Sequence, residues 1–301
     1  MYRLVVILIG RMRLSPSQAI EAYMKLEAVM PTKPAKDDEE RTRNSTAFRT
    51  AFIEVLKEAG LEADAPMVDE NMPKMWVTTS LLQYLLISSR IVCTSNTANV
   101  SVVHPIRSYR TRGALSPSCT VLQAACACVA SPDTFHPVTI GVGHRRAVLI
   151  NAMVACANPT KELLGEAQDV FGEDAEVASI VSIGAGKRII RVVFEDGGEM
   201  GIGEGLRRIA TCEQVHDDLQ GRLEETNIYY RFNVEQELSV DPGVVLAHVS
   251  AYLREKATSG RVDRGIKSIQ YHPTGVKLKD ISKCILISQL VLKLRRFGHG
   301  D

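Results

Sequence analysis

The chain has 301 residues, of which 45% are hydrophobic, enough to fill the core of one large domain or two small ones. Its 36 basic residues nearly balance its 35 acidic residues, and this balance gives no electrostatic reason to expect nucleic acid as a partner. Seven cysteines without CxxC spacing predict free thiols in a reducing, cytoplasmic compartment and no metal site.

The first apolar stretch, Leu4 to Ile9, predicts a buried helix whose beginning lies further upstream. It is too short for a membrane span of about 20 residues, and no signal-peptide cleavage pattern follows it. Ser15, Pro16 and Gln18 then predict the start of a second helix through a capping box. The apolar residues of this helix are expected to form one buried stripe, made of Ile20, Tyr23, Met24, Leu26 and Val29.

The next hundred residues alternate between polar and apolar segments. Thr32 to Arg43 is polar and predicts a surface connection, followed by an amphipathic helix from about Ser45 to Ala59. The uncharged stretch Met75 to Ser89 predicts a buried helix or strand, with a membrane-dipping hairpin as the alternative. Arg90 to Thr94 predicts a strand, and Asn96 to Pro117 predicts a solvated loop that holds Arg107, Tyr109, Arg110 and Arg112.

The second half of the chain alternates strands with helices. Such an order indicates an α/β fold with a largely parallel sheet. The final segment, Ile281 to Phe297, predicts an apolar-basic helix or linker that extends to the end of the chain at residue 301. We expect helices at Thr120–Ala130, Thr160–Phe171, Leu206–Glu225, Pro242–Lys256 and Ser259–Ile269, and strands at Val148–Ala152 and Glu176–Ile183.

Three patterns imitate functional sites. Gly184 to Lys187 follows a strand but lacks the phosphate-loop spacing, and Gly201, Gly203 and Gly205 lack dinucleotide spacing, so we expect no nucleotide as cofactor or partner. His136 follows Asp133 by three residues, but the sequence holds no Gly-x-Ser-x-Gly elbow that such a pair could serve. We therefore expect Asp133 to be a turn residue.

Several segments, in their order and spacing, resemble fungal patatin-like phospholipases. The resemblance runs from about Leu4 to Ile281, apart from Met75 to Ser89, which would be an insertion at about 75–89. The segments that carry it are Leu8–Ser15, Ala19–Tyr23, Arg107–Tyr109, Ala124–Ala127, Ser131–Phe135, Asn158–Leu164, Glu166–Ala167, Ser179–Lys187, Tyr229–Phe232 and Arg261–Asp263.

The resemblance implies a patatin-like three-layer α/β/α domain over residues 1–280, with a mostly parallel sheet that lacks its first strand and nucleophile elbow. Members of this family hydrolyse the acyl esters of lipids with a Ser-Asp dyad. The serine of a Gly-x-Ser-x-Gly elbow attacks the ester, the aspartate is its base, and a glycine-rich loop stabilises the oxyanion. The implied partners are phospholipids or other acyl-ester lipids and, transiently, a membrane surface.

The matched segments place no catalytic residue on this chain. The family serine falls upstream of Met1, and the family aspartate falls on Met153, whose thioether cannot accept a proton. Asp196 to Gly198 imitates the family's Asp-Gly-Gly but follows the strand that it should precede, which indicates a turn. Three interpretations stay open: an acyl hydrolase, a non-catalytic remnant, or a signalling or interaction module of a receptor-like protein.

Overall fold

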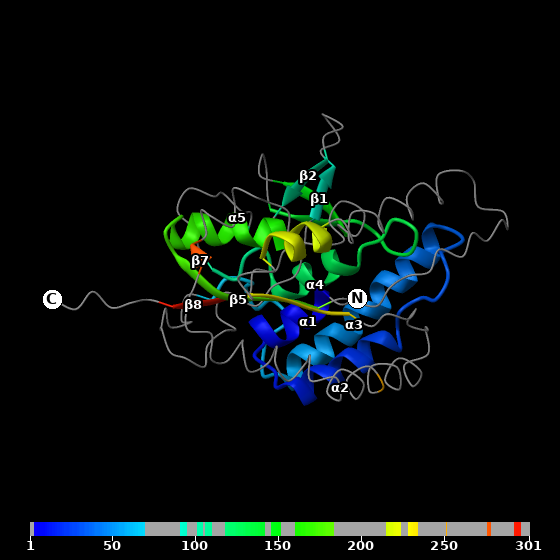
Figure 1. Ribbon diagram of the computed structural model, residues 1–301. Coiled ribbons are helices and arrows are strands. Elements are labelled where there is room, and N and C mark those ends of the chain that lie inside the picture. The colour runs from blue at the N-terminus through cyan, green and yellow to red at the C-terminus, as the bar shows by residue number, and fades with distance from the viewer. Residues whose placement is uncertain are drawn as a thin grey trace. The chain divides into compact units, whose positions relative to one another are not determined.

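The computed structural model describes residues 3–69, 91–94, 101–104, 106–109, 118–141, 146–151, 160–183, 215–223, 228–233, 251, 276–277 and 292–295. Contacts divide the chain into two compact units, unit 1 (Met1–Ala155) and unit 2 (Cys156–Asp301), and each is taken by itself below. Both units combine helices with strands, as expected for a chain of mixed α and β structure (Figure 1).

The N-terminal stretch is a buried helix, which confirms the expectation for Leu4 to Ile9. It consists of α1 (Arg3–Val6), which continues into the π-helix η1 (Ile7–Arg11). Leu4, Ile7 and Leu8 are fully buried. At its end the Leu14 N–H donates to the Leu8 carbonyl at 3.0 Å, and this closing turn requires a left-handed backbone at Arg13, with φ of 59°.

The left-handed backbone at Arg13 is expected to make this position replaceable by glycine. The conformation costs a non-glycine residue about 1–2 kcal/mol, and glycine gives back about 0.5–1 kcal/mol through its freer unfolded chain. Arg13→Gly should therefore raise the free energy of unfolding by roughly 0.5–1 kcal/mol in urea titrations. Arg13→Ala is the control, because it removes the charge beside Arg11 but keeps a Cβ; an equal gain in both variants would assign the effect to charge.

Helix α2 (Pro16–Glu27) begins as predicted. Ser15 Oγ accepts from the Gln18 N–H at 3.3 Å, and Gln18 Oε1 accepts from the Ser15 N–H at 2.9 Å. The expected buried stripe is wrong in part, because Ile20 is 60% exposed and Met24 45% exposed. Ala19 and Ala22 face the core instead, and their small side chains allow the helix to pack closely. Leu26, which belongs to the expected stripe, is buried with them.

Helix α3 (Asp38–Glu58) begins seven residues before the predicted Ser45, so the surface connection expected over Thr32 to Arg43 is partly helical. Asp37 caps it by accepting from the Glu40 N–H at 2.7 Å. Acidic residues in a first helical turn interact favourably with the helix dipole, which explains why this polar segment folds as helix. The helix ends as predicted, before Gly60 in the left-handed region.

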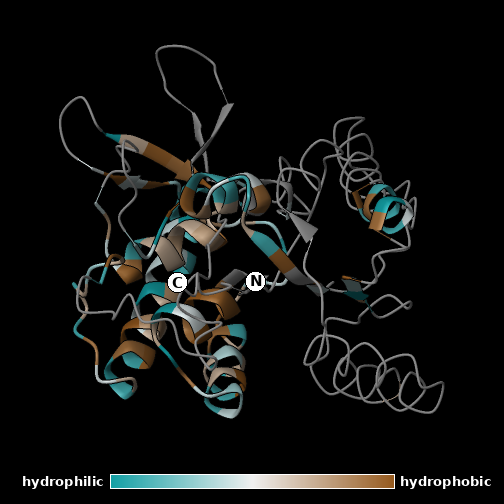
Figure 2. Cartoon of the chain, turned by 60° about the vertical axis from the view of Figure 1, so that its left-hand side comes forward, coloured by the Kyte–Doolittle hydropathy of each residue, from teal (hydrophilic) through white to brown (hydrophobic). Residues whose placement is uncertain are grey.

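Helices α2 and α3 pack against each other and, with α4 (Val121–Val129), enclose the core of unit 1 (Figure 1). Hydropathy colouring shows that α2 and α3 are apolar on one side and polar on the other (Figure 2). Helix α4 confirms its prediction: Thr120 caps it and Gln123 completes a capping box. The largest side chains that are fully buried in this core include Phe48, Phe52, Leu26, Leu56, Met67 and Leu149.

The described sheet of unit 1 is antiparallel throughout, and its strand order is β2-β1-β4-β3. Strands β1 (Ile91–Thr94) and β4 (Ala147–Ile150) confirm two predicted strands to within two residues. Strand β2 (Ser101–His104) lies where a loop was predicted, and β3 (Val138–Ile140) was not predicted. The expected mostly parallel sheet is not found here, because short links join β1 to β2 and β3 to β4, and parallel pairing needs long crossovers.

Unit 2 has α5 (Thr160–Phe171) and β5 (Glu176–Ile183), and both have the predicted bounds. Strand β6 (Tyr229–Phe232) pairs with β5 in parallel, whereas β7 (Val276–Lys277) and β8 (Leu292–Arg295) pair with it antiparallel. Residues 215–223 are helical, within the predicted Leu206–Glu225.

Strand β8 corrects the helix or linker predicted over Ile281 to Phe297 at residues 292–295, the part of that segment that the structure describes. Its sequence alternates leucine with basic residues, which is the period-two pattern of a strand with one buried face. Other predictions lie outside the described residues, namely those for Met75–Ser89, Arg110, Arg112, Met153, Gly184–Lys187, Asp196–Gly198, Gly201–Gly205, Ser259–Ile269 and all but residue 251 of Pro242–Lys256.

Candidate functional site

The end of β4 leads toward Met153, the position that the resemblance assigns to a catalytic base. The last described residue before it is Asn151, whose N–H donates to the carbonyl of Ala130 at 2.8 Å. Because Ala130 is the C-cap of α4, this bond attaches the end of the β3–β4 hairpin to the end of that helix.

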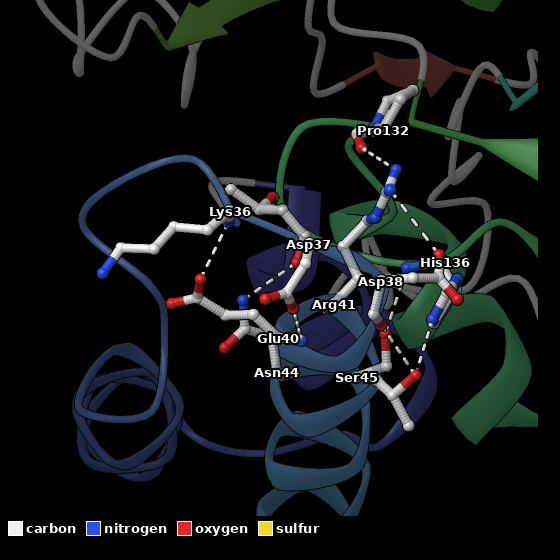
Figure 3. Close-up of polar contacts among 11 residues, drawn as sticks. Lys36, Asp37, Asp38, Glu40, Arg41, Asn44, Ser45, Pro132 and His136 are labelled. Carbon is white, nitrogen blue, oxygen red and sulfur yellow. Dashed lines mark hydrogen bonds and ion pairs between the residues drawn. The ribbon is translucent and has the colours of Figure 1, made fainter.

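His136 and Asp133 do not form a catalytic pair. The His136 ring places Nε2 2.9 Å from Thr42 Oγ1, and Asp133 uses its backbone carbonyl to accept from the Ala35 N–H at 2.8 Å. Figure 3 shows His136 facing the first turns of α3. Asp133 lies in a turn, as the sequence indicated.

The contact between Thr42 and His136 shares the Thr42 hydroxyl with a backbone carbonyl. The hydroxyl oxygen lies 2.9 Å from the Asp38 carbonyl, to which it can donate its single proton. When it does so, it accepts from His136 in the tautomer that carries a proton on Nε2. In this arrangement the contact is a structural hydrogen bond, because a base would need that nitrogen to be an acceptor.

The turn of residues Ser131–His136 is held by the N-terminal half of α3 and the residues before it (Figure 3). Arg41 Nη1 donates to the Pro132 carbonyl at 3.4 Å, and Asn44 Nδ2 donates to the Thr134 carbonyl at 3.0 Å. Ser45 Oγ accepts from the His136 N–H at 3.1 Å. Three side chains of α3 thus bind backbone groups of three residues of the turn.

Arg11 is the second polar centre of unit 1, and the sequence patterns did not single it out. Its side chain is 6% exposed; Nε and Nη2 donate to the Pro66 carbonyl at 3.2 and 2.7 Å, and Nε also donates to the Met67 carbonyl at 3.0 Å. Asp69 Oδ2 lies 3.7 Å from Nη1. An arginine in an otherwise apolar helical stretch is the signal that could have found it.

Burial shapes the electrostatics of Arg11. Loss of solvent lowers the pKa of its guanidinium, the nearby Asp69 carboxylate acts in the opposite sense, and Arg13 lowers the pKa further. The bound segment is itself attached to the start of α4, because Met67 N–H donates to the Cys119 carbonyl at 2.9 Å. Arg11 thus ties η1 to the chain that precedes α4 and serves the fold.

The described thiols are poor nucleophiles. None of Cys119, Cys126 and Cys128 is in a disulfide. Burial raises the pKa of Cys119 to about 12 and that of Cys126 to about 11, so both stay protonated at neutral pH and pack as small apolar side chains, as predicted. Among the described residues, no group of three or more histidine, cysteine and acidic side chains is placed to hold a metal ion.

In unit 2, two polar contacts join neighbouring elements. Arg231 Nη1 donates to Oγ of the fully buried Ser182 at 2.7 Å, across the parallel pair β5–β6. His216 Nδ1 lies 3.1 Å from the Tyr229 hydroxyl, which links residues 215–223 to β6. Both contacts are between adjacent parts of the fold and stabilise the sheet and the helix beside it.

Comparisons of the chain with models of protein families, with curated proteins and with solved structures found no significant match. In the part of the chain that the structure describes, no helix combines the length and apolarity that crossing a bilayer requires.

Proposed function

We propose that this chain is a non-catalytic member of the patatin-like lipid acyl hydrolase family, derived from an enzyme that cleaves phospholipids or other acyl-ester lipids. The observation that carries the proposal is the series of segments that match the family in order and spacing. In this series Met153 stands where the family has its catalytic aspartate. We propose lipids and, transiently, a membrane surface as its partners, because an ancestor of this kind binds both.

The matching segments coincide with ordered elements of the fold. Leu8 to Ser15 covers most of η1 and the cap of α2, and Ser131 to Phe135 forms the turn after α4. Residues 179–183 of the segment Ser179–Lys187 lie on β5, and Tyr229 to Phe232 forms β6. We also propose the three-layer α/β/α domain of the family; among the described strand pairs, β5 with β6 is parallel, as its sheet requires, and the others are antiparallel.

The chemistry explains why this chain should be inactive. Acyl transfer by a Ser-Asp dyad needs a nucleophile, a base that accepts its proton, and donors for the oxyanion. The 301 residues contain no Gly-x-Ser-x-Gly elbow, and a thioether at position 153 cannot be the base. Residues of a dyad act as a unit, so the absence of both members leaves no partial mechanism.

Four proteins, assayed on a short-chain nitrophenyl ester, test the proposal. They are the unmodified chain, Met153→Asp, the chain with a family N-terminal segment that carries the elbow and glycine-rich loop, and the last two changes combined. We expect background rates from the first three and turnover, several orders of magnitude higher, only from the combination. The combination with asparagine at position 153 is the matched control.

Two outcomes would contradict the proposal. Turnover by the unmodified chain that survives repurification and scales with its concentration would mean that another nucleophile is present. A combined variant that folds like the unmodified chain but gives no turnover would contradict the assignment of position 153 to the family aspartate.

A further inference from the structure

We propose that the N-terminal half of α3 is a positioning element for the β3–β4 hairpin, and that Asn44 and Ser45 are the side chains through which it acts. The structural part of this inference stands on the contacts below. Its bearing on position 153 rests on the proposed function, in which Met153 follows the hairpin in the chain and stands where the family has its aspartate.

The Ser131–His136 turn does not supply donors for all of its own carbonyls. The Thr134 and Phe135 N–H groups both donate to the Ser131 carbonyl, at 2.9 and 2.8 Å. The next three carbonyls in the chain are left to water or to donors from other segments. Each has one from the region of α3: the Ala35 N–H, Arg41 Nη1 and Asn44 Nδ2 bind the carbonyls of Asp133, Pro132 and Thr134.

The fourth contact sets the entry into β3. His136 lies two residues before Val138, the first residue of that strand, and its N–H donates to Ser45 Oγ. Backbone groups of four residues in the turn thus bind donors and acceptors that α3 and the chain before it present. Because β3 starts two residues later, this contact positions the start of that strand.

An apolar contact between α3 and the same turn adds to the hydrogen bonds. Phe135 is 3% exposed, and its ring lies edge-on to Phe48 of α3 with centroids 6.1 Å apart. Phe48 in turn stacks on Phe52 at 6.0 Å, which anchors the arrangement in the core. The turn is held by both polar and aromatic side chains of one helix.

The far end of the hairpin meets the same turn. The Ala130 carbonyl, directly before Ser131, accepts from the Asn151 N–H at the end of β4. Hydrogen bonds therefore connect α3 to both ends of the hairpin, through His136 at its start and through the turn and Ala130 at its end. The start and the end of the hairpin are fixed with respect to α3 rather than by the hairpin alone.

Amide hydrogen exchange tests the inference in the full chain. The variant combines Asn44→Asp, which keeps the shape but replaces the donor by an acceptor, with Ser45→Ala. The control is Thr46→Ala on the same exposed stretch, because the Thr46 hydroxyl bonds only within the helix, to the Thr42 carbonyl at 2.8 Å. We expect exchange over residues 138–140 and 147–151 to rise roughly tenfold or more in the variant, since each such bond resists local opening.

Exchange over residues 52–58 of α3 should change by less than about twofold in the variant, and the Thr46→Ala control should match the unmodified chain. Equal acceleration over 52–58 would show a general loss of stability and overturn the inference. Unchanged exchange in the hairpin, or a hairpin already unprotected in the unmodified chain, would overturn it as well. Exchange needs no ester hydrolysis, so failure of this test and failure of the ester assay are distinguishable.

Discussion

Phe48→Ala is expected to lower the free energy of unfolding of unit 1 by about 3–5 kcal/mol, the usual cost of removing a buried aromatic ring from a core. The ring is 1% exposed and contacts two others, Phe52 and Phe135. Its loss leaves a cavity between α3 and the Ser131–His136 turn, so packing is lost on both sides. Urea unfolding followed by circular dichroism measures the change.

Phe48→Leu and Ile20→Ala are the controls for this prediction. Leucine keeps most of the volume and should cost about 1–1.5 kcal/mol. Ile20 is 60% exposed, so its truncation should change stability by less than about 0.5 kcal/mol. If Ile20→Ala instead cost as much as a core truncation, the buried face of α2 would be the one that apolar periodicity predicted.

Arg11→Met is expected to destabilise unit 1 by about 2–4 kcal/mol, because it leaves the buried Met67 carbonyl and the partly buried Pro66 carbonyl without their donors. Methionine keeps the aliphatic volume, so the loss is chiefly one of hydrogen bonds. The same urea titration measures it. The expected cost is large because the guanidinium is almost fully enclosed and bonds to two consecutive carbonyls.

Two further variants separate hydrogen bonding from ion pairing at Arg11. Arg11→Lys keeps the charge but has no planar set of donors, and should cost roughly 1–2 kcal/mol. Asp69→Asn should cost less than about 1 kcal/mol, since the pair is 3.7 Å long and the Asp69 side chain is 31% exposed. A larger loss for Asp69→Asn than for Arg11→Lys would mean that the ion pair dominates.

The candidate site was only partly predictable. The sequence indicated correctly that Asp133 is a turn residue, because proline-containing turns have a local signature. It did not indicate that Thr42 and Ser45 would meet His136, since those residues lie about ninety positions away in the chain. The role of position 153 comes from the family resemblance alone.

The sequence by itself determined features that depend on neighbours within a few residues. The capping box predicted at Ser15 begins α2, and α4 begins where its helix was predicted, with a capping box at Thr120; both partners of each box lie three residues apart. The bounds of α5 and β5 also follow from local periodicity. In the helices the backbone groups are satisfied by nearby chain, whatever the rest of the fold does, whereas the backbone of β5 pairs with the distant strands β6, β7 and β8.

Tertiary structure alone decided the features that depend on distant partners. Ala19 rather than Ile20 faces the core, because α3 packs closely against α2 and small side chains allow the approach. The antiparallel order of the unit 1 sheet was set by pairing between strands far apart, such as β1 with β4. Arg11 is buried because carbonyls more than fifty residues away accept its hydrogen bonds. Burial and pairing of this kind are properties of the packed chain, and a local pattern cannot specify them.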